Sequence, residues 1–139
     1  MVEDSSLCLD ALNGLPGPYV KYFEEQIGPE GIFRMLADFE DKGATAQCLI
    51  GLMDLKQHKP QDNISSDILG MQMFCGQCRG QIVCPQGDQS FGWDACFQPD
   101  GRTVPFSCMT KASKNDISHR ARAFQQLLNY LTCATKEGK

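Results

Sequence analysis

Two short segments of this 139-residue chain carry side chains that suit a flat, polyanionic ligand. Phe91-Gly92-Trp93-Asp94 offers aromatic rings that can stack on a base, a glycine that lets the backbone approach a ligand, and a carboxylate that accepts hydrogen bonds. Residues 111–122 hold four cations against one acid, with Ser118-His119-Arg120 within them. Taken alone, the first segment also fits an aromatic turn in a core, and the second a solvated helix face.

Two further groups could act on phosphates. Glu3 and Asp4 form an acidic pair, and hard divalent cations that bridge phosphates prefer such oxygen ligands. Lys21 follows Pro18, a favoured first helical residue, so we expect Lys21 in the first turn of a helix, where free N–H groups favour phosphate. The pattern alone also allows both groups to be ordinary surface charges.

The first third of the chain is expected to be mainly helical. Residues 7–12 carry apolar side chains at helical spacing before Asn13-Gly14, which predicts a short helix, and the residues before it would be only the end of a strand. A helix over residues 19–27 should close at Gly28, and Pro29 should begin another.

Strands follow, and then one long helix. Alternating apolar residues predict strands over 45–53 and 71–83 that pair antiparallel, the second interrupted at its glycines, with a variable polar loop over about 54–70 between them. The C-terminal helix is expected to run to about Thr132, capped by Ser113 or by Ser118. Its predicted apolar face comprises Ile117, Ala121, Phe124, Leu128 and Leu131.

Several segments resemble the inosine triphosphate pyrophosphatases, which hydrolyse non-standard purine nucleoside triphosphates. Besides Phe-Gly-Trp-Asp and Ser-His-Arg, the matching segments are residues 2–7 (VEDSSL), 14–21 (GLPGPYVK), 39–42 (FEDK), 80–83 (GQIV) and 114–115 (KN). The resemblance therefore runs along nearly the whole chain. It implies a single α/β domain over residues 1–139, with a twisted mixed β-sheet flanked by helices and without the family's N-terminal phosphate loop.

The resemblance also implies a role for each candidate residue. Asp4 would be the catalytic carboxylate that binds Mg²⁺, with Mn²⁺ as a substitute, and helps to activate water. The expected nucleotide contacts are Asp4, Ser5, Lys21, Phe91, Gly92, Trp93, Asp94, Lys114, His119 and Arg120. The implied reaction converts ITP, dITP or XTP to the monophosphate and pyrophosphate, by a homodimer or by a heterodimer with a complete paralogue.

The chain departs from the family near the expected pocket. Cys108 stands where a glutamate is expected, and Pro105-Phe106 replace a more polar stretch. The phosphate loop and a second metal carboxylate are expected to be missing. A catalytically inactive paralogue that acts as a dimerisation partner is therefore an alternative function.

Composition narrows the remaining classes. A net charge of −4 argues against a nucleic-acid surface, and no apolar run approaches the length of a membrane span, so we expect a cytoplasmic protein. Most of the eight cysteines would then be reduced core residues. Cys75-Gly76-Gln77-Cys78 has the spacing of a metal or redox motif, which leaves a cysteine-based module as a less favoured alternative.

Overall fold

The structure is a computed structural model that describes residues 1–53 and 71–137, so the loop expected over about 54–70 lies outside the described residues. The strands are β1 (Val2–Leu9), β2 (Pro16–Gly17), β3 (Gly43–Met53), β4 (Met71–Ile82) and β5 (Phe97–Pro99). The helices are α1 (Val20–Met35), α3 (Lys111–Ile117) and α4 (His119–Glu137), with 3-10 segments η1 (Asp10–Leu12), η3 (Gln89–Ala95) and η4 (Phe106–Cys108).

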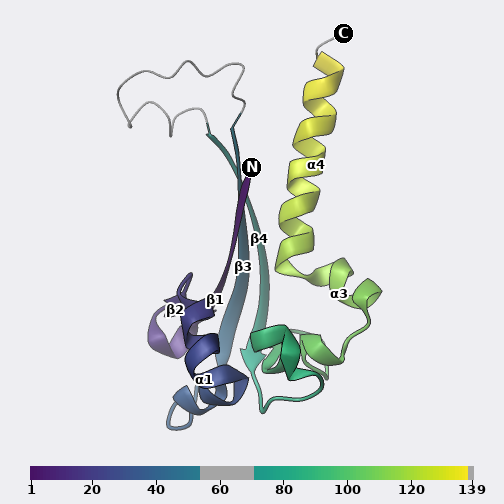
Figure 1. Cartoon of the computed structure of the whole chain (residues 1–139). Coiled ribbons are helices and arrows are strands. Elements are labelled where there is room, and N and C mark those ends of the chain that lie inside the picture. Colours follow the sequence, from purple (N-terminus) through teal and green to yellow (C-terminus); the bar gives the residue numbers. More distant parts are fainter. Residues whose placement is uncertain (54–70, 138–139) are drawn as a thin grey trace, which may run out of the picture.

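The strands form one sheet in the order β2-β1-β3-β4-β5. Long β3 and β4 run side by side at its centre, while α1 lies beside one end and α4 extends along the other (Figure 1). The expected α/β fold with flanking helices is confirmed. Each strand pair among the described residues is antiparallel, so the parallel component of a mixed sheet is not seen there.

The two faces of the sheet differ in what covers them. Alternation along the strands and the β1–β3–β4 register put Glu3, Ser5, Leu7, Cys48, Phe74, Gly76 and Cys78 on one face, here called the covered face. The other face, called the outer face, carries Asp4, Ser6, Thr45, Gln47, Cys75, Gln77 and Arg79. Helices α1 and α4 pack on the covered face, where Leu7, Ile32, Cys48 and Ala123 are fully buried.

The predicted helix over residues 7–12 is wrong. Strand β1 continues to Leu9, and only Asp10–Leu12 form a 3-10 turn, which ends at Asn13 in the left-handed conformation. Leu7 and Leu9 are both fully buried beside Ala46 and Ala44 of β3. Two buried side chains that are two residues apart lie on one face of a strand, so this segment is a strand and not a helix. Asp4 accordingly lies inside an eight-residue strand rather than in a short strand end.

Helix α1 matches its prediction more closely. Gly28 adopts φ 62° and ψ −177°, which no residue inside a helix has, and Pro29 begins the second helical segment. The structure thus has a helix on each side of Gly28, as the two prolines indicate. Ile32 and Leu36 are fully buried in the core, whereas Phe39 is exposed.

Strands β3 and β4 pair as expected, but β4 is not interrupted. Gly76 lies directly beneath α4, where a Cβ atom would collide with the His119 carbonyl oxygen and the Ala123 backbone nitrogen. The glycine therefore permits close packing of a helix on a continuous strand and does not mark a bulge. Two side chains of α4 also bind the β4 edge: Gln126 to Cys75 N and O, and Arg122 to Gln77 O.

The predicted single C-terminal helix is two helices. Thr110 caps α3 by accepting a hydrogen bond from Ser113 N, and Ser118 caps α4 by accepting one from Ala121 N at 3.2 Å. Of the two caps considered, Ser118 is the one found, while Ser113 caps neither helix. The buried positions of α4 include Ala123 and Leu127, whereas Leu128 and Leu131 of the predicted apolar face are exposed.

The CxxC segment lies in regular strand, which separates its two thiols. Cys75 is on the outer face and Cys78 on the covered face, about 10 Å apart along the strand at 3.3 Å per residue. A shared metal or a disulfide needs the two sulfur atoms on one side. This argues against the cysteine-based module, and the eight cysteines are free thiols. No helix in the described part of the chain meets the length and hydropathy of a membrane span.

Candidate active site

A cavity of about 860 Å³ opens on the covered face between β1, the turns η3 and η4, and the start of α4. Residues from segments far apart in the sequence meet there. Its lining includes Ser5, Trp93, Asp94, Phe106, Met109, Lys111, Lys114, Asn115, Ser118, His119, Arg120 and Phe124. The described chain therefore brings together the two segments whose chemistry suits a base and a polyanion.

Aromatic rings form one wall of this cavity. The His119 ring lies between those of Trp93 and Phe106, with centroid separations of 5.4 Å and 6.1 Å. Phe97 supports this wall from the core, edge-on to Trp93 at 5.8 Å and tilted against Phe106 at 5.1 Å. Trp93 is 8% exposed, so the ring that could stack on a base is held by packing on several sides.

The turn that carries Trp93 is fixed by α1. Gly92 has φ 64°, a conformation that favours glycine, and a Cβ atom there would strike the Glu24 carboxylate of α1. That carboxylate accepts a hydrogen bond from the Trp93 backbone, although burial and Asp94 raise the pKa of Glu24. At the start of the turn, Asp88 accepts a hydrogen bond from Ser90 N at 2.9 Å.

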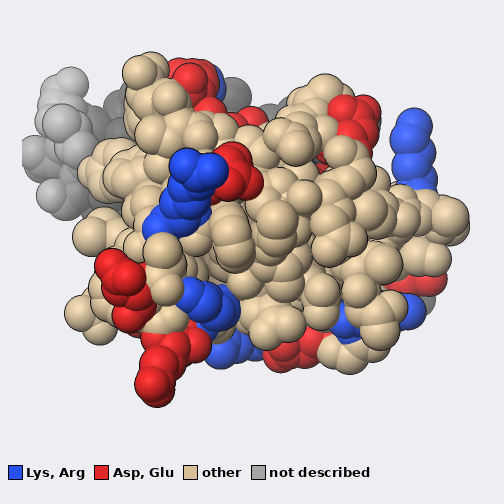
Figure 2. All heavy atoms as spheres, turned by 90° about the horizontal axis from the view of Figure 1, so that it is seen from below, with Lys and Arg blue, Asp and Glu red and all other residues tan. Residues whose placement is uncertain are grey.

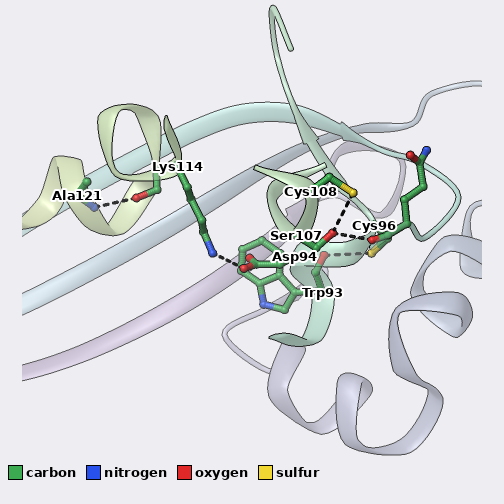
Figure 3. Close-up of polar contacts among 9 residues, drawn as sticks. Trp93, Asp94, Cys96, Ser107, Cys108, Lys114 and Ala121 are labelled. Carbon is green, nitrogen blue, oxygen red and sulfur yellow. Dashed lines mark hydrogen bonds and ion pairs between the residues drawn. The ribbon is translucent and has the colours of Figure 1, made fainter. Parts of the chain in front are cut away.

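Asp94 and Lys114 form an ion pair across the cavity. Figure 3 shows the Lys114 side chain descending from α3 to the Asp94 carboxylate beside the Trp93 indole. The pair is largely enclosed, with side-chain exposures of 12% for Asp94 and 30% for Lys114. The Lys114 ammonium also lies 5.2 Å from the centre of the Phe106 ring, which favours a cation there.

His119 enters the cavity as a neutral imidazole. Burial, together with the nearby Arg120 and Lys114, lowers its pKa to about 4. Its Nδ1 is buried and has no hydrogen-bond partner among the described residues, as is also true of Ser5 Oγ. Buried polar atoms are seldom left unpaired, so both are candidates to bind a ligand.

Arg120 lies at the mouth of the cavity, where a carboxylate of strand β1 binds its side chain. Its Nε donates to Glu3 Oε1 of β1 at 2.6 Å, and Cys48 Sγ lies 3.4 Å from the same oxygen. The salt bridge thus links the start of α4 to β1 across β3. It leaves the two terminal nitrogens of the guanidinium to face other partners.

The structure brings most of the predicted site residues together. Ser5, Trp93, Asp94, Lys114, His119 and Arg120 line the cavity, with Gly92 in the adjoining turn. Asp4 and Lys21 do not line it. Asp4 is exposed on the outer face, and Lys21 lies in the first turn of α1 with a 78% exposed side chain 4.0 Å from Glu25. The side chain of Phe91 lies outside the described part of the structure.

Sequence reasoning missed the roles of three residues at the site, although it had named Glu3 as one of an acidic pair. Phe106 drew attention only as a departure from a more polar family pattern, yet it forms part of the aromatic wall. Glu24 supports the Trp93 turn, and Glu3 binds Arg120. The alternation of β1 could have indicated Glu3, because a strand through residues 2–9 puts Glu3 and Ser5 on one face and Asp4 on the other.

The described residues assemble no ready-made metal site. No group of three or more His, Cys, Asp or Glu side chains among them is arranged to hold a metal ion. Glu3 is engaged by Arg120 and Asp94 by Lys114, which leaves Asp4 as the exposed carboxylate among the predicted ligands. Seen from the end near α1, the surface shows acidic and basic side chains interspersed and no continuous basic area (Figure 2).

Several solved structures share this architecture. The Ham1 protein of Staphylococcus aureus is 27% identical with a TM-score of 0.74, over 95% of this chain and 66% of its own. A HAM1 protein from Coxiella burnetii is 28% identical with a TM-score of 0.76, over 94% of this chain and 66% of its own. A Mycobacterium abscessus protein described as a nucleoside-triphosphatase and dITP/XTP pyrophosphatase is 27% identical with a TM-score of 0.66. The match covers 91% of this chain and 64% of that protein.

The chain thus spans about two thirds of the length of these proteins. The model of the Ham1 family matches residues 1–130, which is nearly the entire sequence. This agrees with the resemblance seen in the sequence and with the arrangement of the sheet and its cavity. The chain belongs to the Ham1 family.

Proposed function

We propose that the chain acts as a nucleoside triphosphate pyrophosphatase on non-standard purine nucleotides such as ITP, dITP and XTP. One observation carries the proposal: a single cavity joins an aromatic wall, an arginine at its mouth and a lysine within it. Family membership and the described activity of the Mycobacterium abscessus protein support the same conclusion. The products are a nucleoside monophosphate and pyrophosphate.

The base would be recognised through the 6-oxo group. A guanidinium can donate two hydrogen bonds to O6 and N7 of a 6-oxopurine, whereas adenine presents an amino donor at the first of these positions. Glu3 binds Nε of Arg120, so the two terminal nitrogens of Arg120 would donate these hydrogen bonds. His119, which is neutral, can hydrogen-bond the base without a positive charge. Trp93 provides a ring for stacking.

The phosphates and their metal ion would lie nearer the rim. Magnesium in nucleotide sites is usually held by one or two carboxylates together with substrate phosphates, so Asp4 with a triphosphate is a chemically suitable ligand set. When bound, the ion neutralises phosphate charge and lowers the pKa of a bound water. Because Asp4 lies on the outer face, a triphosphate that starts in the cavity must cross the β1 edge to reach it.

The side chains of this domain have binding and orienting roles in the proposed reaction, in which water attacks the α-phosphorus and pyrophosphate leaves. Lys114 would neutralise phosphate charge, and the exposed Lys21 would meet the phosphate tail. The aromatic wall and Arg120 would fix the nucleoside so that the α-phosphorus is presented in one orientation. We further propose a homodimer, or a heterodimer with a longer paralogue, as the working unit.

The direct test is release of pyrophosphate from ITP by the purified chain, with ATP as the comparison and with or without Mg²⁺ or Mn²⁺. We expect metal-dependent release that favours ITP and is lost in Asp4→Asn. Asp38→Asn, another exposed carboxylate, is the matched control and should be unaffected. Absence of release from a folded sample, alone and with a longer paralogue, would reject the proposed activity.

A further inference from the structure

We propose that Glu3 is a positioning residue for purine recognition: it fixes the Arg120 guanidinium so that its two terminal nitrogens face the base. This inference rests on the proposed function, because it assumes that Arg120 reads a 6-oxopurine. It assigns a role to the neighbour of Asp4, which acts through Arg120 and does not itself touch the nucleotide.

The geometry of the salt bridge supports this role. Glu3 Oε1 accepts from Arg120 Nε at 2.6 Å, which is the inner nitrogen of the side chain. This choice leaves the terminal nitrogens available, whereas a pairing through them would occupy the donors that a base needs. Arg120 lines the cavity, and no described residue accepts a hydrogen bond from its terminal nitrogens, so these donors can serve a ligand there.

A second contact fixes the carboxylate itself. The Cys48 thiol lies 3.4 Å from Glu3 Oε1 in the neighbouring strand and donates to it. Cys48 is fully buried, and burial together with Glu3 raises the pKa of its thiol to about 11, so the donor proton is retained at neutral pH. Strand pairing of Glu3 with Ile50 and of Ser5 with Cys48 makes this arrangement part of the rigid sheet.

The chain contains a second arginine–glutamate pair of the same geometry that lies away from the cavity and is more exposed. Arg34 Nε donates to Glu30 Oε1 at 2.8 Å between the same two atom types, one helical turn apart on α1. Glu30 is 49% exposed and Arg34 75% exposed, compared with 28% for Glu3 and 60% for Arg120. The Arg34 pair does not line the cavity, so it controls for loss of an arginine–glutamate contact.

The test uses Trp93, the single tryptophan of the chain, as a fluorescent reporter of equilibrium binding. ITP and ATP are titrated in EDTA, which prevents metal-dependent turnover. We expect Glu3→Ala to weaken ITP binding about tenfold or more while ATP binding changes by less than about twofold, since only the base-specific contact is disturbed. Glu3→Gln keeps an acceptor for Nε and should restore most of the ITP preference.

A double-mutant cycle separates positioning from a general structural effect. Arg120→Ala should abolish the ITP preference, and Glu3→Ala added to it should cause no further loss. Glu30→Ala should behave as the unchanged protein. Equal weakening of ITP and ATP by Glu3→Ala, or additive effects of the two substitutions, would overturn the positioning role.

Two outcomes separate this inference from the proposed function. If the unchanged protein binds ITP with preference over ATP and Glu3→Ala keeps that preference, only the role of Glu3 is wrong. If the unchanged, folded protein binds neither nucleotide, the proposed function fails and the purine-positioning role fails with it. The Arg120 Nε–H resonance, expected to shift in Glu3→Ala but not in Glu30→Ala, reports the contact without any nucleotide.

Discussion

The covered and outer faces of the sheet come from the same strands yet serve different purposes. On the covered face, Ser5 lines a cavity and Glu3 binds an arginine, and both lie under elements that are distant in the sequence. On the outer face, Gln47 binds Gln77 at 2.9 Å and Arg79 binds Asp10, contacts that are exposed. Alternation by one residue thus separates the candidate base-binding cavity from a face that, apart from the proposed metal ligand Asp4, carries exposed polar contacts.

The difference shows how packing creates a site. The aromatic wall, the Lys114–Asp94 pair and the neutral His119 all depend on α3, α4 and η3 lying close to the covered face. His119 and the Lys114–Asp94 pair are largely buried, so their electrostatic interactions should be strong, whereas the Gln47–Gln77 and Arg79–Asp10 contacts are exposed and should contribute little. Variants of matched chemistry on the two faces should therefore have unequal effects.

The largest effect is expected from Gly76→Ala on the covered face. The new methyl group meets backbone atoms of His119 and Ala123, which cannot move unless α4 shifts, so the free energy of unfolding should fall by about 3 kcal/mol or more. Gly51→Ala on β3 is the control, because its methyl group meets the side chains of Met71, Val2 and Met73. Urea unfolding that gives similar losses for both would contradict close packing of α4 on β4.

Acidification should reveal the buried histidine. The pKa of His119 is lowered to about 4 in the folded chain from 6.5, so the unfolded state binds the extra proton in this window. Stability should therefore decrease as the pH falls from 6.5 towards 4, by up to about 3 kcal/mol. His119→Gln should remove this component, as measured by unfolding of both proteins at several pH values. An equal dependence of stability on pH in the two proteins would refute a buried neutral His119.

A smaller loss is expected when the enclosed ion pair is broken. Lys114→Met leaves Asp94 with little solvent and without its cation, which should cost about 2 kcal/mol after allowance for partial exposure. Adding Asp94→Asn removes the uncompensated charge and should recover part of the stability. Thermal or urea unfolding of the single and double variants measures this, and full additivity of two losses would contradict direct pairing.

Substitutions that break exposed ion pairs on the outer face should reduce stability least. Arg79 binds Asp10 through both terminal nitrogens, yet the two side chains are 52% and 34% exposed. Arg79→Met should therefore cost no more than about 1 kcal/mol and leave ITP binding unchanged. Loss of nucleotide binding in this variant, by the same fluorescence titration, would show that outer-face residues other than Asp4 contribute to nucleotide binding.

Local patterns predicted the parts of the fold that local chemistry determines. The break at Gly28-Pro29, the strands that became β3 and β4, and a cap at Ser118 all follow from residue types and spacing. Residues 7–12 were predicted wrongly because six apolar-rich residues fit both a helical and a strand period. The segment is a strand because Leu7 and Leu9 pair with β3, which is distant in the sequence.

The site residues likewise divide into those that local motifs predicted and those that only the packing of the fold reveals. The motifs identified most of the residues that meet in the cavity, because their types are those that bind bases and phosphates. They gave no indication that Gly76 sets the distance between α4 and β4, or that Phe106 joins the aromatic wall. Both depend on side chains brought together by the folded sheet, and neither has a local periodic signal.

The most direct test of the account is a crystal structure of this chain with inosine monophosphate. We expect the base in the cavity on the covered face, stacked on the wall formed by Trp93, His119 and Phe106, with O6 within hydrogen-bond distance of the Arg120 guanidinium. A base bound on the outer face, or an empty cavity at saturating ligand, would contradict the claim that this cavity recognises a 6-oxopurine.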